Sequence, residues 1–225
     1  MTTVGGPVRV LHLCPDTHHL GELFDLYRQA LNEPPFESTV VFLRGAADAA
    51  LARQFGPRVT FLDLPRPALD GLRLRALWRL WRWGLAQPRF DLVIAHRFKP
   101  LTLALGLRRM GRVRQIFGVV HELGQFEGRR RCIIQHADAS SLTLIGVSGA
   151  VQADLRRRFP GFPPQRIKSL PNAVRASTLH PREQALAALG LSPERFWLGS
   201  LGRLVPVKGH DALLRAFAPL AREFP

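Results

Sequence analysis

Short apolar stretches alternate with amphipathic helical stretches along most of the chain, and this alternation constrains the fold more than any other feature. Residues 20–31, for example, carry apolar side chains at the spacing of one helix face, shortly after the apolar residues 8–13. Strands separated by helices form a parallel sheet with helices on both faces, so a Rossmann-like α/β domain is predicted. The predicted strands are residues 8–13, 37–43, 59–64, 90–96, 115–121, 142–147 and 167–170, and the predicted helices are residues 20–31, 46–55, 72–85, 100–110, 129–139 and 148–159.

Polar residues directly follow several of the predicted strands. In an open parallel sheet, ligands bind outside the carboxyl ends of the strands, so these residues are candidates for a binding cleft. His96 and His121 each end a strand, where a histidine can donate a hydrogen bond to a ligand hydroxyl or to developing negative charge. The alternative is that each histidine only caps its strand. The other cleft candidates are Asp16, His18, His19, Ser148 and Asn172.

Cysteine content and hydropathy exclude several classes of protein. The two cysteines, Cys14 and Cys132, cannot supply a disulfide scaffold, so a reducing compartment is expected. His12, Cys14, His18 and His19 lack the spacing of a zinc site, and no metal is expected. We find no secretory signal and no apolar run near the roughly 20 residues that span a bilayer. A cytoplasmic protein is predicted, with the inner face of the membrane as a candidate location.

The chain is strongly basic, with 32 Lys and Arg against 17 Asp and Glu and a net charge of +15. Most of this charge is arginine, whose guanidinium pairs well with phosphate, so an anionic partner is expected: a nucleotide, nucleic acid, phospholipid or phosphorylated glycan. The alternative is a solvated, arginine-rich surface. Nucleic acid is not expected, because no helix-turn-helix, zinc or RNA-binding signature is present. The absence of G-x-G-x-x-G after the first strand disfavours a dinucleotide oxidoreductase.

The predicted helix over residues 72–85 has two interpretations. The favoured one is a helix that covers the sheet with its apolar face and exposes its arginine face. The alternative is an interfacial helix, with tryptophan at the level of lipid headgroups and arginine against anionic lipid. Trp83 lies off the apolar face and is expected to be exposed, which supports the alternative. The apolar face consists of Leu74, Leu77, Trp78, Trp81 and Leu85, and the arginine face of Arg75, Arg79 and Arg82.

The composition changes after residue 174, which indicates a domain boundary. We predict an N-terminal domain over residues 1–174, a linker over 175–194 and the start of a second domain over 195–225. This last segment is predicted to hold one strand, residues 196–201, and one helix, residues 210–224. A single strand and helix cannot form a stable domain, so an incomplete second α/β domain is expected.

The loop between that last strand and helix carries Gly202, Arg203 and Lys208. Glycine lets the backbone approach a ligand closely, and two cations near a helix N-terminus favour a diphosphate. The alternative is an ordinary strand–loop–helix corner with two exposed cations.

The stretch GSLGRLVPVKGHDALLRAFAPL resembles the opening of the donor domain in the retaining two-domain (GT-B) glycosyltransferases. Three upstream segments, FDLVIAHRF, IGVSGAVQADLRRRF and RIKSLPNAV, resemble segments of the same family in the same order. The resemblance covers residues 90–220 and implies the N-terminal half of a GT-B fold. It further implies contacts of Arg203 and Lys208 with the donor phosphates, a position of His121 near the donor sugar, and transfer without a metal cofactor.

The sequence departs from the family pattern at several positions. Ala173 replaces the usual glycine after Asn172, and Arg175 stands where an acidic residue is common. The first loop has Gly21 in place of a glycine pair that approaches the donor phosphate. The family's E-x7-E glutamate pair, which binds donor sugar and ribose, has no counterpart within the 225 residues, so the chain alone is expected not to transfer sugar.

The resemblance implies a hexosyltransferase that uses a nucleotide-diphosphate sugar. The expected acceptor is a lipid-linked or polysaccharide glycan, and the expected process is synthesis of a cell-envelope glycan such as lipopolysaccharide. The alternative is a truncated, non-catalytic basic module that binds an anionic glycan, a lipid surface or a protein partner.

Overall fold

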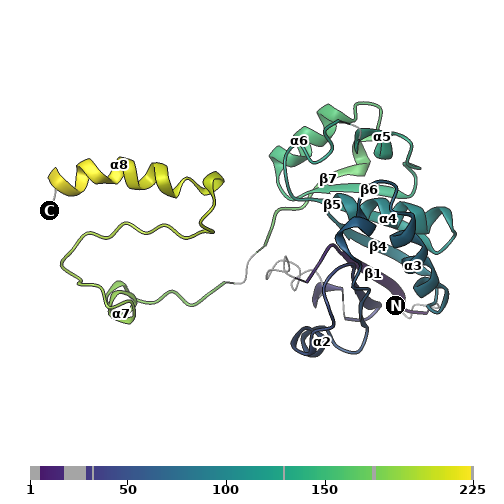
Figure 1. The fold of residues 1–225 in the computed structure, drawn as a ribbon, viewed down its shortest axis with the longest axis horizontal. Helices are drawn as coiled ribbons and strands as arrows, with labels where there is room; N and C mark the ends of the chain where they lie inside the picture. The colour runs from purple at the N-terminus through teal and green to yellow at the C-terminus, as the bar shows by residue number, and fades with distance from the viewer. Residues whose placement is uncertain (1–5, 18–28, 32, 129, 174–175, 224–225) are drawn as a thin grey trace. The chain divides into compact units, whose positions relative to one another are not determined.

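The structure, a computed structural model, describes residues 6–17, 29–31, 33–128, 130–173 and 176–223 (Figure 1). Two of the predicted cleft residues, His18 and His19, and most of the predicted helix over 20–31 lie outside the described residues. The chain divides into two units, Met1–Arg175 and Ala176–Pro225, and each is described by itself.

The first unit is built on a seven-stranded sheet with the order β3-β2-β1-β4-β5-β6-β7. Every pair of neighbouring strands is parallel, which confirms the predicted Rossmann-like fold. Strands β2 and β3 are added on one side of β1, and strands β4 to β7 on the other side. The direction of strand order therefore reverses between β1 and β4, and sheets of this kind bind ligands in the crevice at that point. The strands are β1 (Val8–Cys14), β2 (Phe36–Phe42), β3 (Val59–Phe61), β4 (Phe90–His96), β5 (Val113–Val120), β6 (Leu142–Gly146) and β7 (Ile167–Ser169).

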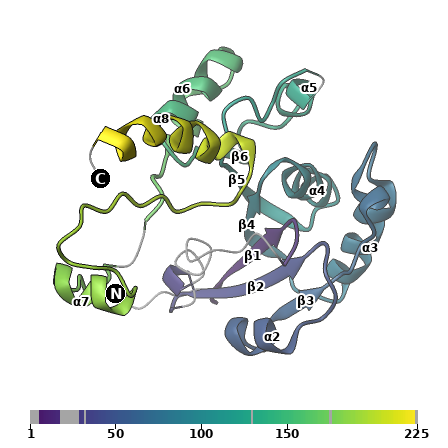
Figure 2. The ribbon, with the colours of Figure 1, turned by 60° about the vertical axis from the view of Figure 1, so that its left-hand side comes forward.

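Both faces of the sheet are covered, because successive side chains of a strand point to opposite faces. Leu11 and Leu13 of β1 belong to the main core, whereas Val10 and Cys14 belong to clusters on the other face. Helix α4 packs against β4 and β5, and α3 lies beside α4 (Figures 1 and 2). Phe55 of α2 packs in the cluster around Cys14. The helices are α2 (Ala49–Phe55), α3 (Leu74–Leu85), α4 (Phe98–Arg109), α5 (Arg130–Gln135) and α6 (Gly149–Arg158), with 3₁₀ turns η1 (Arg66–Leu69) and η2 (Pro164–Arg166).

Helix α3 buries a face that matches the predicted one only in part: Leu77 and Trp81 pack against the core as predicted, and the arginine face is exposed. Trp83, which we expected to be exposed, packs against the core, and its ring stacks on Phe90 with 6.0 Å between centroids. Trp78, which we expected in the core, is 52% exposed. Stacking of Trp83 on the buried ring of Phe90 holds that side of the helix toward the sheet. The fully buried residues of this helix are Ala76, Leu80 and Gly84, whereas Leu74, Trp78 and Leu85 are exposed.

Helix α5 ends at Gln135, four residues before the predicted end at residue 139. The carboxylate of Asp138 accepts hydrogen bonds from the backbone N–H of Ser140 at 2.9 Å and from its hydroxyl at 2.6 Å. This local turn competes with the helix for the backbone, as is typical of Asp and Ser. Across all the described residues, no helix is long and apolar enough to cross a membrane.

The second unit contains helix α7 (Arg182–Ala188), the turn η3 (Pro206–Lys208) and helix α8 (His210–Glu223). The predicted strand over residues 196–201 is wrong, since the structure describes these residues as irregular. A strand needs a neighbouring strand for its N–H and C=O groups, and the described residues of this unit provide none. Trp197 instead makes a local contact, donating its indole N–H to the carbonyl oxygen of Ser192 at 2.7 Å.

Candidate functional site at the carboxyl ends of the strands

Three histidines from adjacent strands form a row near the carboxyl ends of β1, β4 and β5. The ring centroids of His12 and His96 are 6.1 Å apart, as are those of His96 and His121. His12 and His96 are buried, and His121 is half-buried in the first position after β5. The structure therefore brings together the two predicted catalytic histidines, His96 and His121. It also places His12 in the same row, which its position inside a strand had not indicated.

The surroundings of His96 and His121 favour neutral rings. Burial, followed by the imidazoles of His12 and His121, holds the pKa of His96 well below its usual value. Burial, followed by the guanidinium of Arg97, lowers the pKa of His121, and the carboxylate of Glu122 partly opposes this. Both rings are therefore neutral at pH 7, where an imidazole offers one N–H donor and one acceptor. At His121 such a ring can hydrogen-bond a ligand without adding a charge to the site.

A pocket with a cavity volume of about 280 Å³ opens at the carboxyl ends of β1, β2, β4 and β5. This volume is close to the lower end of the range for small-molecule sites. Its walls include Asp16 after β1, Arg44 after β2, Arg97 after β4 and Glu122 after β5. The pocket therefore lies where the topology of the sheet predicts a ligand, and it contains the predicted cleft residue Asp16.

Sequence reasoning missed the cations of this pocket. Arg44, Arg97, Lys99 and Arg130 all line it, although they come from separate parts of the chain. The available signal was position, since Arg97 directly follows β4 in the same way that His121 follows β5. Arg97 also has φ 72° and ψ 178°, a backbone conformation that is nearly confined to glycine and costs other residues about 1–3 kcal/mol.

The buried ring of Phe98 lies against two guanidiniums, that of the pocket residue Arg130 and that of Arg73. The guanidinium carbon of Arg73 lies 5.2 Å from the ring centroid, and that of Arg130 lies 5.1 Å from it. Cations at this distance from an aromatic ring are attracted to its electron-rich face. Phe98 packs edge-on against Phe126 at 5.9 Å, so the ring that positions these arginines is itself fixed by the core.

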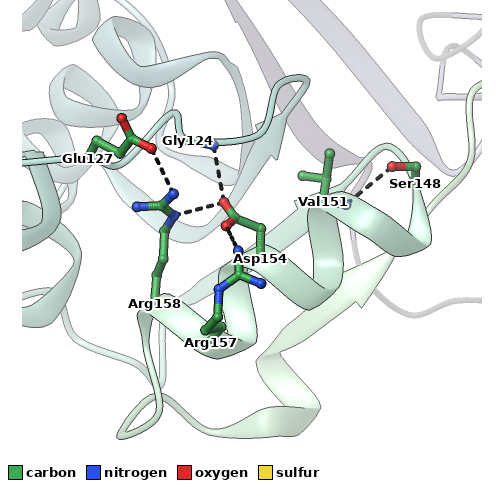
Figure 3. Close-up of polar contacts among 7 residues, drawn as sticks. All are labelled: Gly124, Glu127, Ser148, Val151, Asp154, Arg157 and Arg158. Atoms are coloured by element: carbon green, nitrogen blue, oxygen red, sulfur yellow. Dashed lines mark hydrogen bonds and ion pairs between the residues drawn. The ribbon is translucent and has the colours of Figure 1, made fainter.

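A buried carboxylate ties the loop after β5 to helix α6 (Figure 3). Asp154 accepts hydrogen bonds from the backbone N–H of Gly124 at 3.1 Å, from Arg157 at 2.5 Å and from Arg158 at 2.8 Å. Arg158 also donates to Glu127 at 2.9 Å. Burial alone would raise the pKa of Asp154, but these hydrogen bonds outweigh it and lower that pKa. The network fixes the loop that begins at the predicted catalytic histidine.

Ser148 has a structural role that explains its presence without a ligand, and Asn172 lies at the surface. The hydroxyl of Ser148 accepts a hydrogen bond from the backbone N–H of Val151 at 3.2 Å and caps helix α6 (Figure 3). Asn172 is exposed in the segment after β7. Contact of either residue with an acceptor stays a prediction.

The predicted donor-phosphate residues form an exposed loop before helix α8. His210, the first residue of this helix, places Nε2 3.2 Å from the carbonyl oxygen of Arg203 and Nδ1 3.3 Å from the hydroxyl of Ser200. A Cβ atom at Gly202 would lie 3.3 Å from the same Nε2, so glycine suits the close approach there. Lys208 ends the turn η3, and its contact with a phosphate, like that of Arg203, stays a prediction.

Comparisons with solved structures show the fold. Two structures of HepE from Anabaena, one in complex with UDP and one with UDP and glucose, align with 94% and 93% of this chain at TM-scores of 0.66 and 0.67 and identities of 17% and 18%. WaaB, a lipopolysaccharide outer core galactosyltransferase solved in its apo form, aligns with 76% of the chain at a TM-score of 0.54 and 16% identity. The chain covers 57% of HepE and 47% of WaaB.

The sequence itself identifies the family. A comparison with curated protein sequences gives no match. The family described as Glycosyltransferase Family 4 matches residues 26–178, which is more than half of the chain and includes β2 to β7 of the sheet. The chain therefore belongs to Glycosyltransferase Family 4.

Proposed function

We propose that the protein is a glycosyltransferase that moves a sugar from a nucleotide-diphosphate donor to an acceptor held at the carboxyl ends of the strands. The observation that carries the proposal is the family match over residues 26–178. The pocket at the strand ends of the first unit supports it, because acceptor binding needs such a site. HepE is described in complex with UDP, which makes UDP the first nucleotide to test.

The proposed chemistry is mainly electrostatic. Arg203 and Lys208 would neutralise the leaving diphosphate, and charge stabilisation of this kind is commonly the largest catalytic contribution. His121 would donate a hydrogen bond from its neutral ring to the donor sugar, with His96 packed behind it. Retention of configuration and transfer without a metal cofactor are part of the proposal and rest on the family resemblance.

The exposed side of helix α3 supports a place at an anionic membrane surface. Leu74, Trp78 and Leu85 are 67%, 52% and 51% exposed. The guanidinium of Arg82 lies 5.2 Å from the ring centroid of Trp78, so apolar and cationic groups share this side of the helix. Tryptophan and arginine together suit the headgroup region of anionic lipid. We therefore include peripheral binding to the cytoplasmic face of the membrane, and a lipid-linked envelope glycan as the acceptor.

Sedimentation with lipid vesicles tests the membrane part of this proposal. The variant with Trp78→Ser and Arg82→Gln should bind vesicles of phosphatidylglycerol more weakly than the unaltered chain does. The matched control is Arg58→Gln, which removes an exposed arginine paired with Glu37 near the amino ends of β2 and β3. Equal vesicle binding by both variants would show that helix α3 does not contact the membrane.

A binding module without catalytic activity is the second candidate. It is favoured by one observation, the excess of 32 Lys and Arg over 17 Asp and Glu. Such a module would use its basic first unit to hold an anionic glycan, lipid or partner.

Transfer of labelled glucose from UDP-glucose to a lipid extract of the producing cells separates the two candidates. The assay compares the 225-residue chain with the protein that the native cells produce from the same gene, each with Lys208→Ala and Arg203→Ala variants. Transfer that falls at least tenfold in both variants supports the transferase. Binding of nucleotide sugar without transfer in either protein favours the module, and the absence of both overturns the proposed donor.

A further inference from the structure

The pocket at the strand ends gathers four cations from three different places in the sequence. Arg44 follows β2, Arg97 and Lys99 follow β4, and Arg130 begins α5. Arg97, Lys99 and Arg44 are half-buried, whereas Arg130 is exposed. Convergence of separated arginines on one small cavity is a specific arrangement, because a basic composition alone would spread them over the surface.

The carboxylates near the pocket do not cancel this charge. Asp70 accepts a hydrogen bond from Lys99 at 2.7 Å, and this ion pair neutralises the charge of the lysine. Asp16 and Glu122 also line the pocket, so two negative charges remain there to balance the three positive charges of the arginines. The pocket therefore keeps a positive potential that an anionic ligand would neutralise.

The backbone at Arg97 supports a ligand role for its side chain. Its φ of 72° is rarely adopted by residues other than glycine, and it occurs directly at the carboxyl end of β4. Glycine would fit this conformation without strain, so fold stability does not explain arginine there. Strained positions of this kind concentrate at binding and active sites.

We propose that this pocket binds a phosphate or diphosphate group carried by the acceptor substrate. The inference rests on the proposed function and adds the chemical class of its acceptor. Guanidinium groups pair with phosphate oxygens in a two-pronged geometry, and three of them around one cavity exceed what a single carboxylate needs. A volume of about 280 Å³ holds a phosphorylated headgroup but not a long glycan. The predicted donor-phosphate residues, Arg203 and Lys208, belong to the other unit, and the proposal therefore gives this pocket to the acceptor.

Calorimetric titration of the 225-residue chain tests the proposal without requiring transfer. The probes are inorganic pyrophosphate, farnesyl diphosphate, glucose 6-phosphate and UDP. The variants are Arg97→Gly, which relieves the backbone strain while removing the charge, and Arg130→Gln. Arg58→Gln is the control, since it removes one arginine away from the pocket. Equal or higher thermal unfolding midpoints for Arg97→Gly show that any lost affinity is not a folding defect.

The expected result is that pyrophosphate binds and that each pocket variant weakens it about tenfold, the effect of losing one charged hydrogen-bond pair. The control should change affinity less than twofold. Preference for farnesyl diphosphate would identify a lipid diphosphate acceptor, and preference for glucose 6-phosphate a phosphorylated glycan. Both results support the proposal.

Three results would overturn the proposal. Two concern the phosphate probes: no phosphate probe binds, or the binding is insensitive to both pocket variants. A third would be UDP binding that weakens in the same variants to the same extent, because the pocket would then hold the donor phosphates. Failure of the proposed function would look different, with no transfer and no UDP binding but intact, variant-sensitive binding of pyrophosphate.

Discussion

His96 links the histidine row to the stability of the first unit. Its pKa is held well below the usual value by burial and by His12 and His121, so the folded chain keeps it neutral. The unfolded chain takes up a proton near pH 6.5. As pH falls below that value, the unfolded state binds more protons than the folded state, and stability decreases by up to about 1.4 kcal/mol per pH unit for each such histidine.

We therefore expect the unaltered chain to lose stability between pH 7 and pH 5, and His96→Gln to show a shallower loss. Urea unfolding at several pH values measures this directly. The exposed His180 provides the control, as His180→Gln should keep the original slope. An unchanged slope in His96→Gln would show that His96 is not the buried neutral group.

Asp154 is the residue on which the loop after β5 depends. Its buried carboxylate accepts three hydrogen bonds, two of them from arginines and one from the backbone of Gly124. Asp154→Asn removes the negative charge from these contacts, and we expect a loss of about 2 kcal/mol in the free energy of unfolding. Urea denaturation measures it. Asp211→Asn breaks an exposed pair with Arg215 and should have little effect, because surface ion pairs contribute little.

At the scale of elements, the corner between β6 and α6 makes glycine necessary at one position and replaceable at another. A Cβ atom at Gly146 would lie 2.8 Å from the backbone nitrogen of Gln152, whereas one at exposed Gly149 would meet nothing within 4 Å. Gly146→Ala should destabilise the protein by about 1–3 kcal/mol, as overpacking does. Gly149→Ala should be neutral or stabilise it by up to about 1 kcal/mol through helix propensity. Thermal unfolding of the two variants compares them, and equal midpoints would contradict this packing.

The strands of the first unit were predictable because burial on both faces leaves continuous apolar runs. The run over residues 90–96 matches β4, and that over 142–147 differs from β6 by one residue. The face of α3 was not predictable from its periodicity alone. The buried side is centred on Ala76 and Leu80 and also includes Trp83, whereas the spacing of the larger apolar side chains indicated a side that shares only Leu77 and Trp81 with it.

The candidate site was only partly predictable for a related reason. Strand ends could be found in the sequence, and they led to His96, His121 and Asp16. The convergence of Arg44 and Arg130 depends on which loops the sheet order brings together, and no local pattern encodes that. The prediction of a strand over residues 196–201 was wrong. An apolar run forms a strand only where a neighbouring strand can accept its hydrogen bonds.

For the whole molecule, the two units have unequal roles in folding. Among the described residues, every member of the three hydrophobic core clusters belongs to the first unit. In the second unit, large apolar side chains such as Phe196, Leu201 and Leu214 are exposed. Burial of apolar area is the main source of stability, so the first unit should hold nearly all of the stability of the chain.

A chain of residues 1–173 should therefore unfold in urea at nearly the same midpoint as the 225-residue chain, with the transition followed by far-UV circular dichroism. The two proposed phosphate sites separate in the same variant, because Arg203 and Lys208 are deleted while Arg97 and Arg130 remain. Pyrophosphate binding should persist and UDP binding should be lost. A much lower midpoint would mean that residues 174–225 support the fold of the first unit. Retained UDP binding at full affinity would show that the first unit alone binds the donor phosphates. The strand-end pocket would then be the donor site, and its assignment to the acceptor would be wrong.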